Sequence, residues 1–502
     1  MTMADYITDI AYPHFFQRET TPVWLNFVAT ALGRRCADLR QPFAVCELGC
    51  GQGFGSVLQA AANPQGHFVG VDFNPAHVEH GRGLAAAVGV SNVEFIENTF
   101  AGMLSASGEE PQYDFIVLHG VYSWVSEADR ATLRAFIERQ LKPDGIAFVG
   151  YMSQPGLEFF SAPRRFVQQY AQASSGTSAE RVMAGLRALQ RLCRSGAGVF
   201  AHDPRIADYV DRILGDNPSY LAHELLNEHW ATLPVADVIR DFETIGTTYL
   251  GSATPIDNVN ALSLPGNVLP MLADLPGTRL RETFKDLARN QTHRRDLYQR
   301  ASASVSEAEH RDALLEQVVA ALPGAPASGS VRLDTRIGPV EGNASLFSPI
   351  LDALAVRPQR FSVLARMPQL ERQIGDISPA LQALAWAGHV HPMLPGRVDV
   401  ATCQAFNRVI SERVIAGERY SHLAAPSLGS GIAANFVEMS AARVLLDHPG
   451  LRGPLLRETV DAMLRRSGWK AVDNPAEPLG AQLARFEREV LPIWQQFGVV
   501  GS

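Results

Sequence analysis

The chain has 502 residues, of which 46% are hydrophobic and 19% are charged, so it is long enough for two or three globular domains. Its net charge of -8 excludes the basic surplus that is typical of a non-specific nucleic-acid-binding protein. The first ten residues lack the pattern of a signal peptide and no apolar run reaches about 18 residues, so we expect a cytoplasmic protein without a membrane span.

Short apolar runs alternate with helical stretches in the first third of the chain. Asn74 before Pro75 is typical of a helix start, and Ser126 with Asp129 resembles a capping box. Strands alternating with helices predict a parallel sheet with helices on both faces, as in Rossmann-like α/β folds. The runs rich in Val, Ile and Phe that we interpret as strands are 42–48, 67–73, 92–98, 113–119 and 146–152.

The pattern changes after residue 157. Residues 157–227 show no strand-like alternation and are interpreted as a helical insertion. An amphipathic helix at 233–246 then ends at a glycine and precedes a strand at 247–255. We expect this strand to be the sixth of a seven-stranded sheet and to pair with the fifth, while 294–302 supplies the seventh.

The composition changes again near residue 303. Residues 303–330 are rich in Ser, Ala, Pro and Gly, which predicts a linker. This linker would separate a sheet domain, made of 1–156 and 228–302, from a mainly helical C-terminal region at 331–502. Because few contacts need to cross a linker, we expect a chain that ends near Ala303 to fold on its own.

The start of the C-terminal region has a recognisable order of segments. Helical stretches at 348–354, 361–367 and 378–388 are followed by GHVHPML, which is compatible with a strand. This order resembles a winged-helix arrangement.

The strongest chemical motif is ELGCGQG at residues 47–53, between the first strand and a helix that begins near Ser56. Its glycines, Gly49, Gly51 and Gly53, allow a sharp turn and a close approach of the backbone to a ligand. Asp72 ends the second strand, 21 residues after Gly51, where a carboxylate can accept hydrogen bonds from both hydroxyls of a ribose.

Two positions separate S-adenosylmethionine (AdoMet) from a nicotinamide dinucleotide as that ligand. The dinucleotide fingerprint GxGxxG requires a third glycine at position 54, which is Phe54. The carboxylate of Glu47 suits a positively charged ligand with an amine better than it suits a pyrophosphate. The motif therefore predicts AdoMet, with a dinucleotide or a fold that has lost its ligand as the minor alternatives.

With these motifs the chain resembles the class I methyltransferases that carry a methyltransferase regulatory domain. The bacterial lysine methyltransferases that act on outer-membrane proteins belong to this group. The glycine motif is generic, whereas HGVYSW at 119–124 and YLAHELLN at 220–227 are more specific, and the resemblance covers about residues 1–300. It implies AdoMet as cofactor, a protein substrate, and a role for the insertion as a lid or as the contact of a homodimer.

Two departures from that family affect the expected roles. The family pattern NxxFxxxD places a carboxylate near the adenine amine, but here Thr99 stands at that place after Asn98, which could substitute. The family's Tyr-Asn-Thr at the end of the fifth strand is Tyr151-Met152-Ser153, so any role of that asparagine is lost.

We expect the ligand-binding residues to lie at the carboxyl ends of the strands. The candidates for AdoMet binding are Glu47, Gly49, Gly51, Gly53, Asp72, Phe73, Asn98, Thr99 and His119. The candidates for catalysis are His119, Tyr122 and Tyr151. His119 could instead fix its loop, and the two tyrosines could line the acceptor channel or only pack.

Other aromatic and polar residues are weaker candidates. Trp124 is interpreted mainly as packing, and Tyr12 could fold over the cofactor or pack in the core. Tyr220, His223 and Glu224 lie on one helical stretch and could face the cleft. His223 and His229 form no HExxH motif and the five cysteines form no CxxC pair, so no metal is expected.

The first functional hypothesis is a protein lysine N-methyltransferase, and it depends on the resemblance. The alternatives are a small-molecule or glycan methyltransferase and a non-catalytic AdoMet-binding regulator. No [DN]PP[YFW] motif follows the fourth strand and no Pro-Cys pair occurs, which argues against methylation of nucleic-acid bases. The C-terminal region would shape the cavity for a large acceptor or control access to it.

Overall fold

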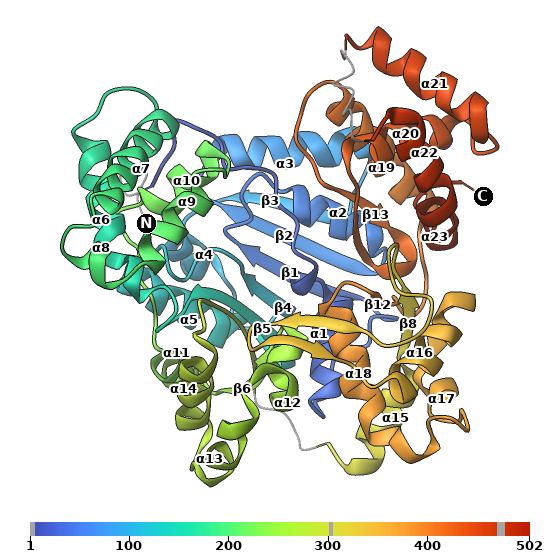
Figure 1. Cartoon of the computed structure of the whole chain (residues 1–502), viewed down its shortest axis with the longest axis horizontal. Coiled ribbons are helices and arrows are strands. Elements are labelled where there is room, and N and C mark those ends of the chain that lie inside the picture. The colour runs from blue at the N-terminus through green and yellow to red at the C-terminus, as the bar shows by residue number, and fades with distance from the viewer. Residues whose placement is uncertain (1–5, 301–304, 469–476, 502) are drawn as a thin grey trace.

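A seven-stranded mixed sheet forms the centre of the protein (Figure 1). The computed structural model describes residues 6–300, 305–468 and 477–501. The strand order is β3-β2-β1-β4-β5-β7-β6, and only β7 runs antiparallel to its neighbours. The strands are β1 (Phe43–Leu48), β2 (Gly66–Asp72), β3 (Val93–Glu97), β4 (Tyr113–Leu118), β5 (Leu141–Met152), β6 (Thr247–Ser252) and β7 (His293–Arg300).

This sheet confirms the Rossmann-like fold predicted from the sequence, but one predicted pairing was wrong. β6 belongs to the sheet, yet it pairs with β7 and not with β5. β5 has no free edge for β6, because β4 pairs with one edge and β7 pairs with the other along Ile146–Met152. β6 therefore takes the outer position beside β7, whose Leu297 and Tyr298 pack into the hydrophobic clusters on opposite faces of the sheet.

Helices cover both faces of the sheet. On one face lie α1 (Pro22–Ala31), α2 (Phe54–Ala62) and α3 (Pro75–Val88). On the other face lie α4 (Phe100–Ala106), α5 (Glu127–Gln140) and α11 (Val235–Glu243). The predicted helix starts at Asn74 and Ser126 are present, since their side chains accept hydrogen bonds from the backbone of Ala76 and Asp129.

The chain between β5 and α11 forms a helical layer with its own hydrophobic cluster. Arg164 is buried there and donates to the carbonyl oxygens of Leu225 and Asn227, so the first helix of the layer is fastened to the last. The helices are α6 (Ser161–Gln172), α7 (Ser178–Arg194), α8 (Val199–His202), α9 (Arg205–Ile213) and α10 (Pro218–Leu225).

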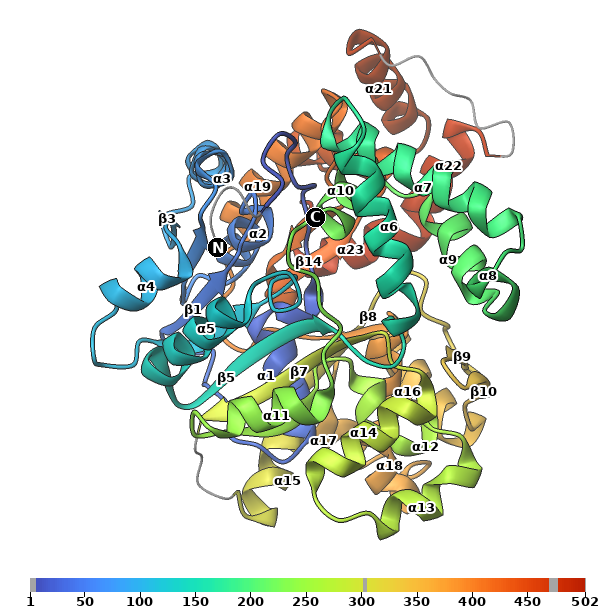
Figure 2. The same ribbon diagram turned by 90° about the vertical axis from the view of Figure 1, so that its left-hand side faces the viewer.

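A second group of helices connects β6 to β7 and packs against α11. Figure 2 shows these helices below β5 and β7. They are α12 (Asn260–Ser263), α13 (Leu269–Asp274) and α14 (Thr278–Arg289).

Half of the predicted linker at 303–330 consists of regular elements. Residues 301–304 lie outside the described residues, but α15 (Glu307–Glu316) and β8 (Val318–Ala321) follow directly. β8 is the central strand of a small sheet with β11 (Gln359–Arg360) and β12 (Val390–Pro392). Val319 and Ala320 are buried because they extend the hydrophobic cluster that α1 and α2 share with the C-terminal region.

The first part of the C-terminal region packs helices against this small sheet. Three helices stand there in the order that suggested a winged helix, which stays a prediction. A separate hairpin is formed by β9 (Arg332–Thr335) and β10 (Gly338–Glu341). The helices are α16 (Ala344–Val356), α17 (Phe361–Leu364) and α18 (Ile374–Trp386).

The described residues from 400 onward are mainly helical and contact α2 and α3 directly. Figure 1 shows them at the opposite side of the sheet from the insertion α6–α10. The ring of Phe54 on α2 stacks on Phe406 with centroids 5.9 Å apart, so the C-terminal region belongs to the core of the sheet domain. The elements are α19 (Val400–Ile415), β13 (His422–Ala425), β14 (Ser430–Ala433), α20 (Phe436–Asp447), α21 (Gly453–Arg466), α22 (Leu479–Arg485) and α23 (Leu491–Phe497).

Within residues 6–300, 305–468 and 477–501, none of the helices combines the length and the apolar character that crossing a lipid bilayer requires.

Candidate active site

A cavity opens where β1, β2 and β4 end, at the carboxyl edge of the sheet. It contains about 1140 Å³ of empty space, its open mouth included. All residues expected to bind AdoMet lie on its wall, together with Tyr12 and Trp124: Glu47, Gly49, Gly51, Gly53, Asp72, Phe73, Asn98, Thr99 and His119. The sequence motifs therefore meet in one place.

The glycine motif forms the floor of this cavity. Gly49, Gly51 and Gly53 have φ values of 83°, 55° and 74°, in the left-handed region that favours glycine. A Cβ atom on Gly53 would lie 2.4 Å from Phe95 Cε1, and one on Gly49 would lie 2.5 Å from Val121 Cγ2. Side chains at these positions would therefore strain the backbone of the glycine loop and clash with its neighbours.

Asp72 fixes the glycine loop and still has free acceptor capacity. Its Oδ2 accepts a hydrogen bond from Gly51 N at 2.9 Å, and its Oδ1 accepts one from Asn74 N at 2.9 Å. His77 Nδ1 lies 3.4 Å from Oδ1. A carboxylate offers about four lone pairs, so Asp72 can accept further bonds from a ligand in the cavity.

Glu47 supplies a second carboxylate to the same wall. Ser56 Oγ donates a hydrogen bond to Glu47 Oε2 at 2.6 Å. Burial raises the Glu47 pKa to about 7, and the nearby charge of Asp72 adds to the rise. A positively charged ligand beside Glu47 would offset this penalty, which fits the ammonium group of AdoMet.

Three further polar atoms of the wall support a polar ligand. Among the described residues, His14 Nδ1, Gln59 Oε1 and His77 Nε2 are buried without a hydrogen-bond partner. Since a buried polar atom without a partner is unfavourable, the cavity suits a ligand that carries several donors and acceptors. The residues present therefore fit AdoMet.

Asn98 and Thr99 shape the edge of the cavity at the start of α4. Asn98 Oδ1 accepts a hydrogen bond from Thr99 N at 2.9 Å, and Thr99 Oγ1 caps the helix by accepting from Gly102 N at 3.1 Å. Both side chains are thus engaged locally, and their contact with adenine stays a prediction.

His119 lies on the cavity wall just after β4. Its ring stacks on Phe15, with centroids 5.5 Å apart and an angle of 16° between the planes. Burial lowers the His119 pKa to about 4, and the charge of Arg295 adds to the effect. The imidazole is therefore neutral at physiological pH.

Tyr122 and Tyr151 do not line this cavity, which favours packing over an acceptor channel among the two alternatives left open by the sequence. Both are buried on the other face of the sheet, among the side chains of α5 and α11. Arg134 Nη1 donates to Tyr122 Oη at 2.8 Å, and Tyr151 Oη donates to Asp296 Oδ2 at 2.7 Å. The sequence placed both tyrosines at the correct edge but did not reveal which face they point to.

The residues that precede α1 also wall the cavity; we call residues 6–17 the N-terminal strap. Its contributing side chains are Tyr6, Tyr12, Pro13, His14, Phe15, Phe16 and Gln17. Only Tyr12 was expected from the sequence. The aromatic run YPHFF at 12–16 was the available signal, but a run of this kind does not reveal its partners.

The insertion fastens one end of the strap. Ser178 donates to Asp9 through its amide at 2.8 Å and its hydroxyl at 2.7 Å, and His223 Nε2 lies 3.1 Å from the carbonyl oxygen of Ile10. Tyr12 Oη donates to Glu224 Oε1 at 3.5 Å. His223 and Glu224 thus contact the strap and do not line the cavity.

Tyr220 and Trp124 complete this contact. The rings of Tyr12 and Tyr220 have centroids 6.4 Å apart, and Trp124 Nε1 donates to the carbonyl oxygen of Glu224 at 3.4 Å. Burial raises the Glu224 pKa to about 8.

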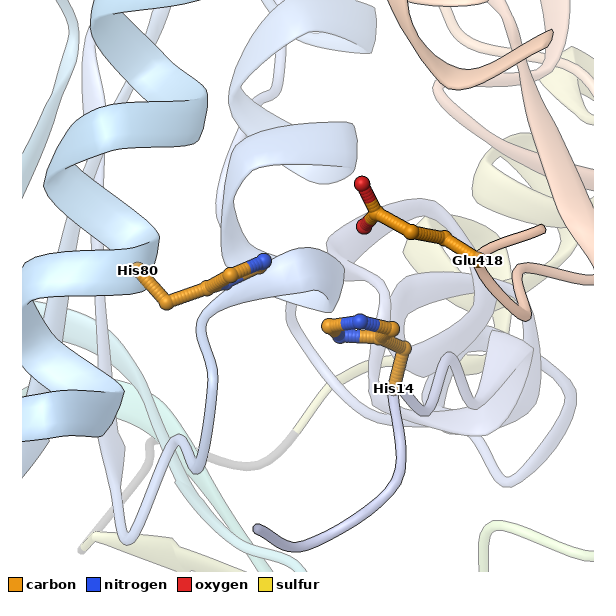
Figure 3. A group of neighbouring side chains, drawn as sticks. All are labelled: His14, His80 and Glu418. Carbon is orange, nitrogen blue, oxygen red and sulfur yellow. The ribbon is translucent and has the colours of Figure 1, made fainter. Parts of the chain in front are cut away.

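A cluster of His14, His80 and Glu418 joins the strap to α3 and the C-terminal region (Figure 3). Their potential ligand atoms lie within 4.8 Å of one another, an arrangement that the sequence did not suggest. Arg413 Nη1 is 3.5 Å from His80 Nε2 and 3.9 Å from Glu418 Oε2. Because this guanidinium already supplies a positive charge, we assign no metal to the cluster.

Comparisons with known proteins agree with this architecture. Residues 40–215 match a methyltransferase domain, and residues 217–300 match a predicted methyltransferase regulatory domain. A protein of Synechocystis sp., described as uncharacterized, is 28% identical over 437 residues, which are 86% of each chain. A protein of Rickettsia prowazekii with the same description is 26% identical over 271 residues, 51% of this chain and 47% of that one.

The most informative solved structure is that of PKMT2 from Rickettsia typhi. It has a TM-score of 0.65 at 18% identity and covers 91% of this chain and 98% of its own. The same protein in complex with AdoHcy has a TM-score of 0.64 at 18% identity, with the same coverage. At this identity the likeness establishes the fold, which extends through the C-terminal region.

The sheet, the glycine loop and the matched methyltransferase domain together define an AdoMet-dependent methyltransferase. Its methyltransferase domain is followed by the methyltransferase regulatory domain, which contributes β6 and β7 to the sheet.

Proposed function

We propose that this enzyme transfers methyl groups to lysine side chains of a protein acceptor. The resemblance carried by HGVYSW at 119–124 and YLAHELLN at 220–227 supports the proposal. The structural observation that carries it is the pair of rings, Phe15 and His119, on the cavity wall.

This pair suits an aliphatic chain that ends in an amine. Phe15 is 49% exposed although it lines the cavity, so its ring offers apolar surface to an incoming group. The parallel rings of Phe15 and His119 would contact the four methylene groups of a lysine, whose stem buries readily along apolar surface.

The surroundings of this wall also favour a neutral amine. At neutral pH a lysine must lose its proton before methylation, which requires about 4 kcal/mol. Arg295 lies two residues before Leu297 on β7, so both side chains face the same side of the sheet, the side of Phe148 and His119. A second positive charge near Arg295 is unfavourable, so the pKa of an ammonium group there would fall.

Arg295 can act in this way because its charge is not neutralised locally. Within the described part of the chain it forms no ion pair, and its hydrogen bond is to Thr254 Oγ1 at 3.3 Å. His119 adds no charge of its own, and as a neutral imidazole it can accept a hydrogen bond from the amine.

The cofactor would occupy the floor and the opposite wall. Bound AdoMet supplies the activated methyl group, so the protein needs to provide orientation and exclusion of water. We assign Asp72 to the ribose hydroxyls, Glu47 to the ammonium group, and Phe73, Asn98 and Thr99 to the adenine side.

The test is methylation of a cell-envelope protein fraction by the full-length enzyme with methyl-labelled AdoMet. A matched fraction with its lysines acetylated serves as the control, and the small-metabolite fraction is assayed in parallel. We expect label in protein that disappears after acetylation. Label in metabolites or free glycans alone would refute the proposal and favour the small-molecule or glycan alternative.

The remaining expectations, a cytoplasmic location and a homodimer formed through 157–227, stay predictions.

A further inference from the structure

The middle of the N-terminal strap is held by a ring from the far end of the chain. His14 stacks on Tyr420 with centroids 4.2 Å apart and an angle of 14° between the planes. The ring of His80 also stacks on His14, with centroids 4.7 Å apart and an angle of 29° between the planes. His14 therefore contacts the methyltransferase domain and the C-terminal region at once, as Figure 3 shows for His80 and the Glu418 segment.

Tyr420 is itself firmly oriented. Its hydroxyl donates to Glu418 Oε2 at 2.9 Å, accepts from Arg413 Nη1 at 3.1 Å, and lies 3.2 Å from His80 Nε2. The ring is buried, with 7% of its surface exposed, and lies 4.9 Å from the ring of Phe54 at the start of α2. A ring fixed in this way can fix the side chain that stacks on it.

The same group reaches the glycine loop. His80 Nδ1 donates to the carbonyl oxygen of Gln52 at 2.7 Å, and the side-chain amide of Gln52 donates to the carbonyl oxygen of Tyr12 in the strap. The cavity floor and the strap are thus connected to each other, and Tyr420 contacts both through His80 and His14. The glycine loop and the strap, which both line the cavity, therefore share this support.

The stacking geometry also distinguishes a support from a metal site. Two imidazoles bind one ion through nitrogen lone pairs that lie in the ring planes and converge on it. In this cluster the rings of His14 and His80 lie nearly face to face, and Arg413 lies beside them.

We propose that Tyr420 is a positioning residue through which the C-terminal region holds the N-terminal strap closed over bound AdoMet. The proposal rests on AdoMet occupying the cavity, and it is independent of which acceptor is methylated. The C-terminal region would then control how fast the product AdoHcy leaves, in addition to any role in acceptor binding.

The experiment compares full-length variants by the dissociation rate of AdoHcy, measured by stopped-flow displacement. Tyr420→Leu removes the ring, whereas Tyr420→Phe keeps the ring and removes the hydroxyl. An aromatic pair contributes enough for the leucine variant to release AdoHcy about 2- to 10-fold faster. The phenylalanine variant keeps the ring on His14 but loses the hydroxyl contact with His80, so its rate should lie between those of the leucine variant and the wild type. Tyr170→Leu, an exposed tyrosine on α6, is the matched control and should be unchanged.

A double-mutant cycle separates positioning from a general loss of structure. His14→Leu should accelerate release as Tyr420→Leu does, and the double variant should be no faster than the single ones, because the two residues act through one contact. Additive effects, an unchanged rate in Tyr420→Leu, or equal rates in the leucine and phenylalanine variants would overturn the proposal. If Tyr420→Leu does not fold, the Tyr420→Phe rate decides, because Tyr420 does not line the cavity and its hydroxyl holds the ring; a rate equal to that of the wild type would overturn the proposal. A wild-type protein that binds no AdoHcy would instead refute the assignment of the cavity.

Discussion

Removing the Asp72 carboxylate should abolish most of the AdoMet affinity. Asp72 uses one lone pair of each oxygen for Gly51 N and Asn74 N, both at 2.9 Å, and can offer the others to two ribose hydroxyls. Hydrogen bonds to a charged group contribute about 1.5–3 kcal/mol each, so two of them correspond to about 3–6 kcal/mol. We therefore expect Asp72→Ala to weaken binding by about 10²- to 10⁴-fold.

Titration calorimetry of the full-length variant with AdoMet measures this change directly. Because Asp72 also fixes the glycine loop, a thermal melt must show that the variant is folded. Glu97→Gln is a suitable control, since Glu97 ends the neighbouring strand β3, is exposed and lies off the cavity wall. An affinity of folded Asp72→Ala within about threefold of the wild type would show that the ribose lies elsewhere.

Three further predictions follow from the site and its surroundings. Burial raises the Glu47 pKa to about 7, and the ammonium group of AdoMet requires the charged carboxylate, so the affinity for AdoMet should fall about tenfold from pH 8 to pH 6. Calorimetry should show no such pH dependence of the affinity for Glu47→Gln. The same pH dependence in this variant would contradict the assignment. Because the Glu47 pKa is higher in the folded state than the value near 4.5 in the unfolded state, protonation of Glu47 stabilises the fold. This contribution to the free energy of unfolding is complete below pH 4.5 and is lost as the pH rises through 7. In Gly53→Ala the new Cβ would lie 2.4 Å from Phe95, whereas in Gly89→Ala, at a φ of 81°, it would meet open space. Gly53→Ala should therefore lower the free energy of unfolding, measured in urea, by at least about 1 kcal/mol more than Gly89→Ala does. Equal losses would mean that the clash relaxes. Tyr151→Phe should lower the free energy of unfolding by about 1–3 kcal/mol, because Asp296 loses a hydrogen-bond donor at 2.7 Å. The value of kcat should stay unchanged. A loss of kcat at unchanged stability would support a catalytic role for Tyr151.

The sequence was sufficient to predict the sheet but not every pairing in it. Runs such as YDFIVLH at 113–119 combine apolar character with flanking turn residues, which marks a strand locally. Which strand lies next to β6 depends on β4 and β7 taking both edges of β5, a property of the assembled sheet. In the same way, β8 has only four residues and is followed by Pro- and Gly-rich chain, so its burial could not be read from composition.

The site was predictable where function requires a special backbone or charge. Gly49, Gly51 and Gly53 have positive φ values, and Asp72 follows at the expected distance, so local sequence was enough. The strap was missed because its contacts are remote: His14 packs on Tyr420, more than 400 residues later. The expected independent folding of a chain ending near Ala303 has no support in the structure, since Phe54 packs on Phe406.

The place of β7 in the sheet has a consequence for synthesis on the ribosome. Residues 153–292 must be made between the end of β5 and the start of β7. At about 5–20 residues per second this takes roughly 7–30 s, during which the outer edge of β5 has no partner. That edge belongs to the run IAFVGYM at 146–152, and unpaired apolar strands of this kind associate with one another. Slowing the translation of residues 153–292 should therefore lower the yield of native enzyme. Co-expression of a chaperone that binds exposed strands should restore the yield.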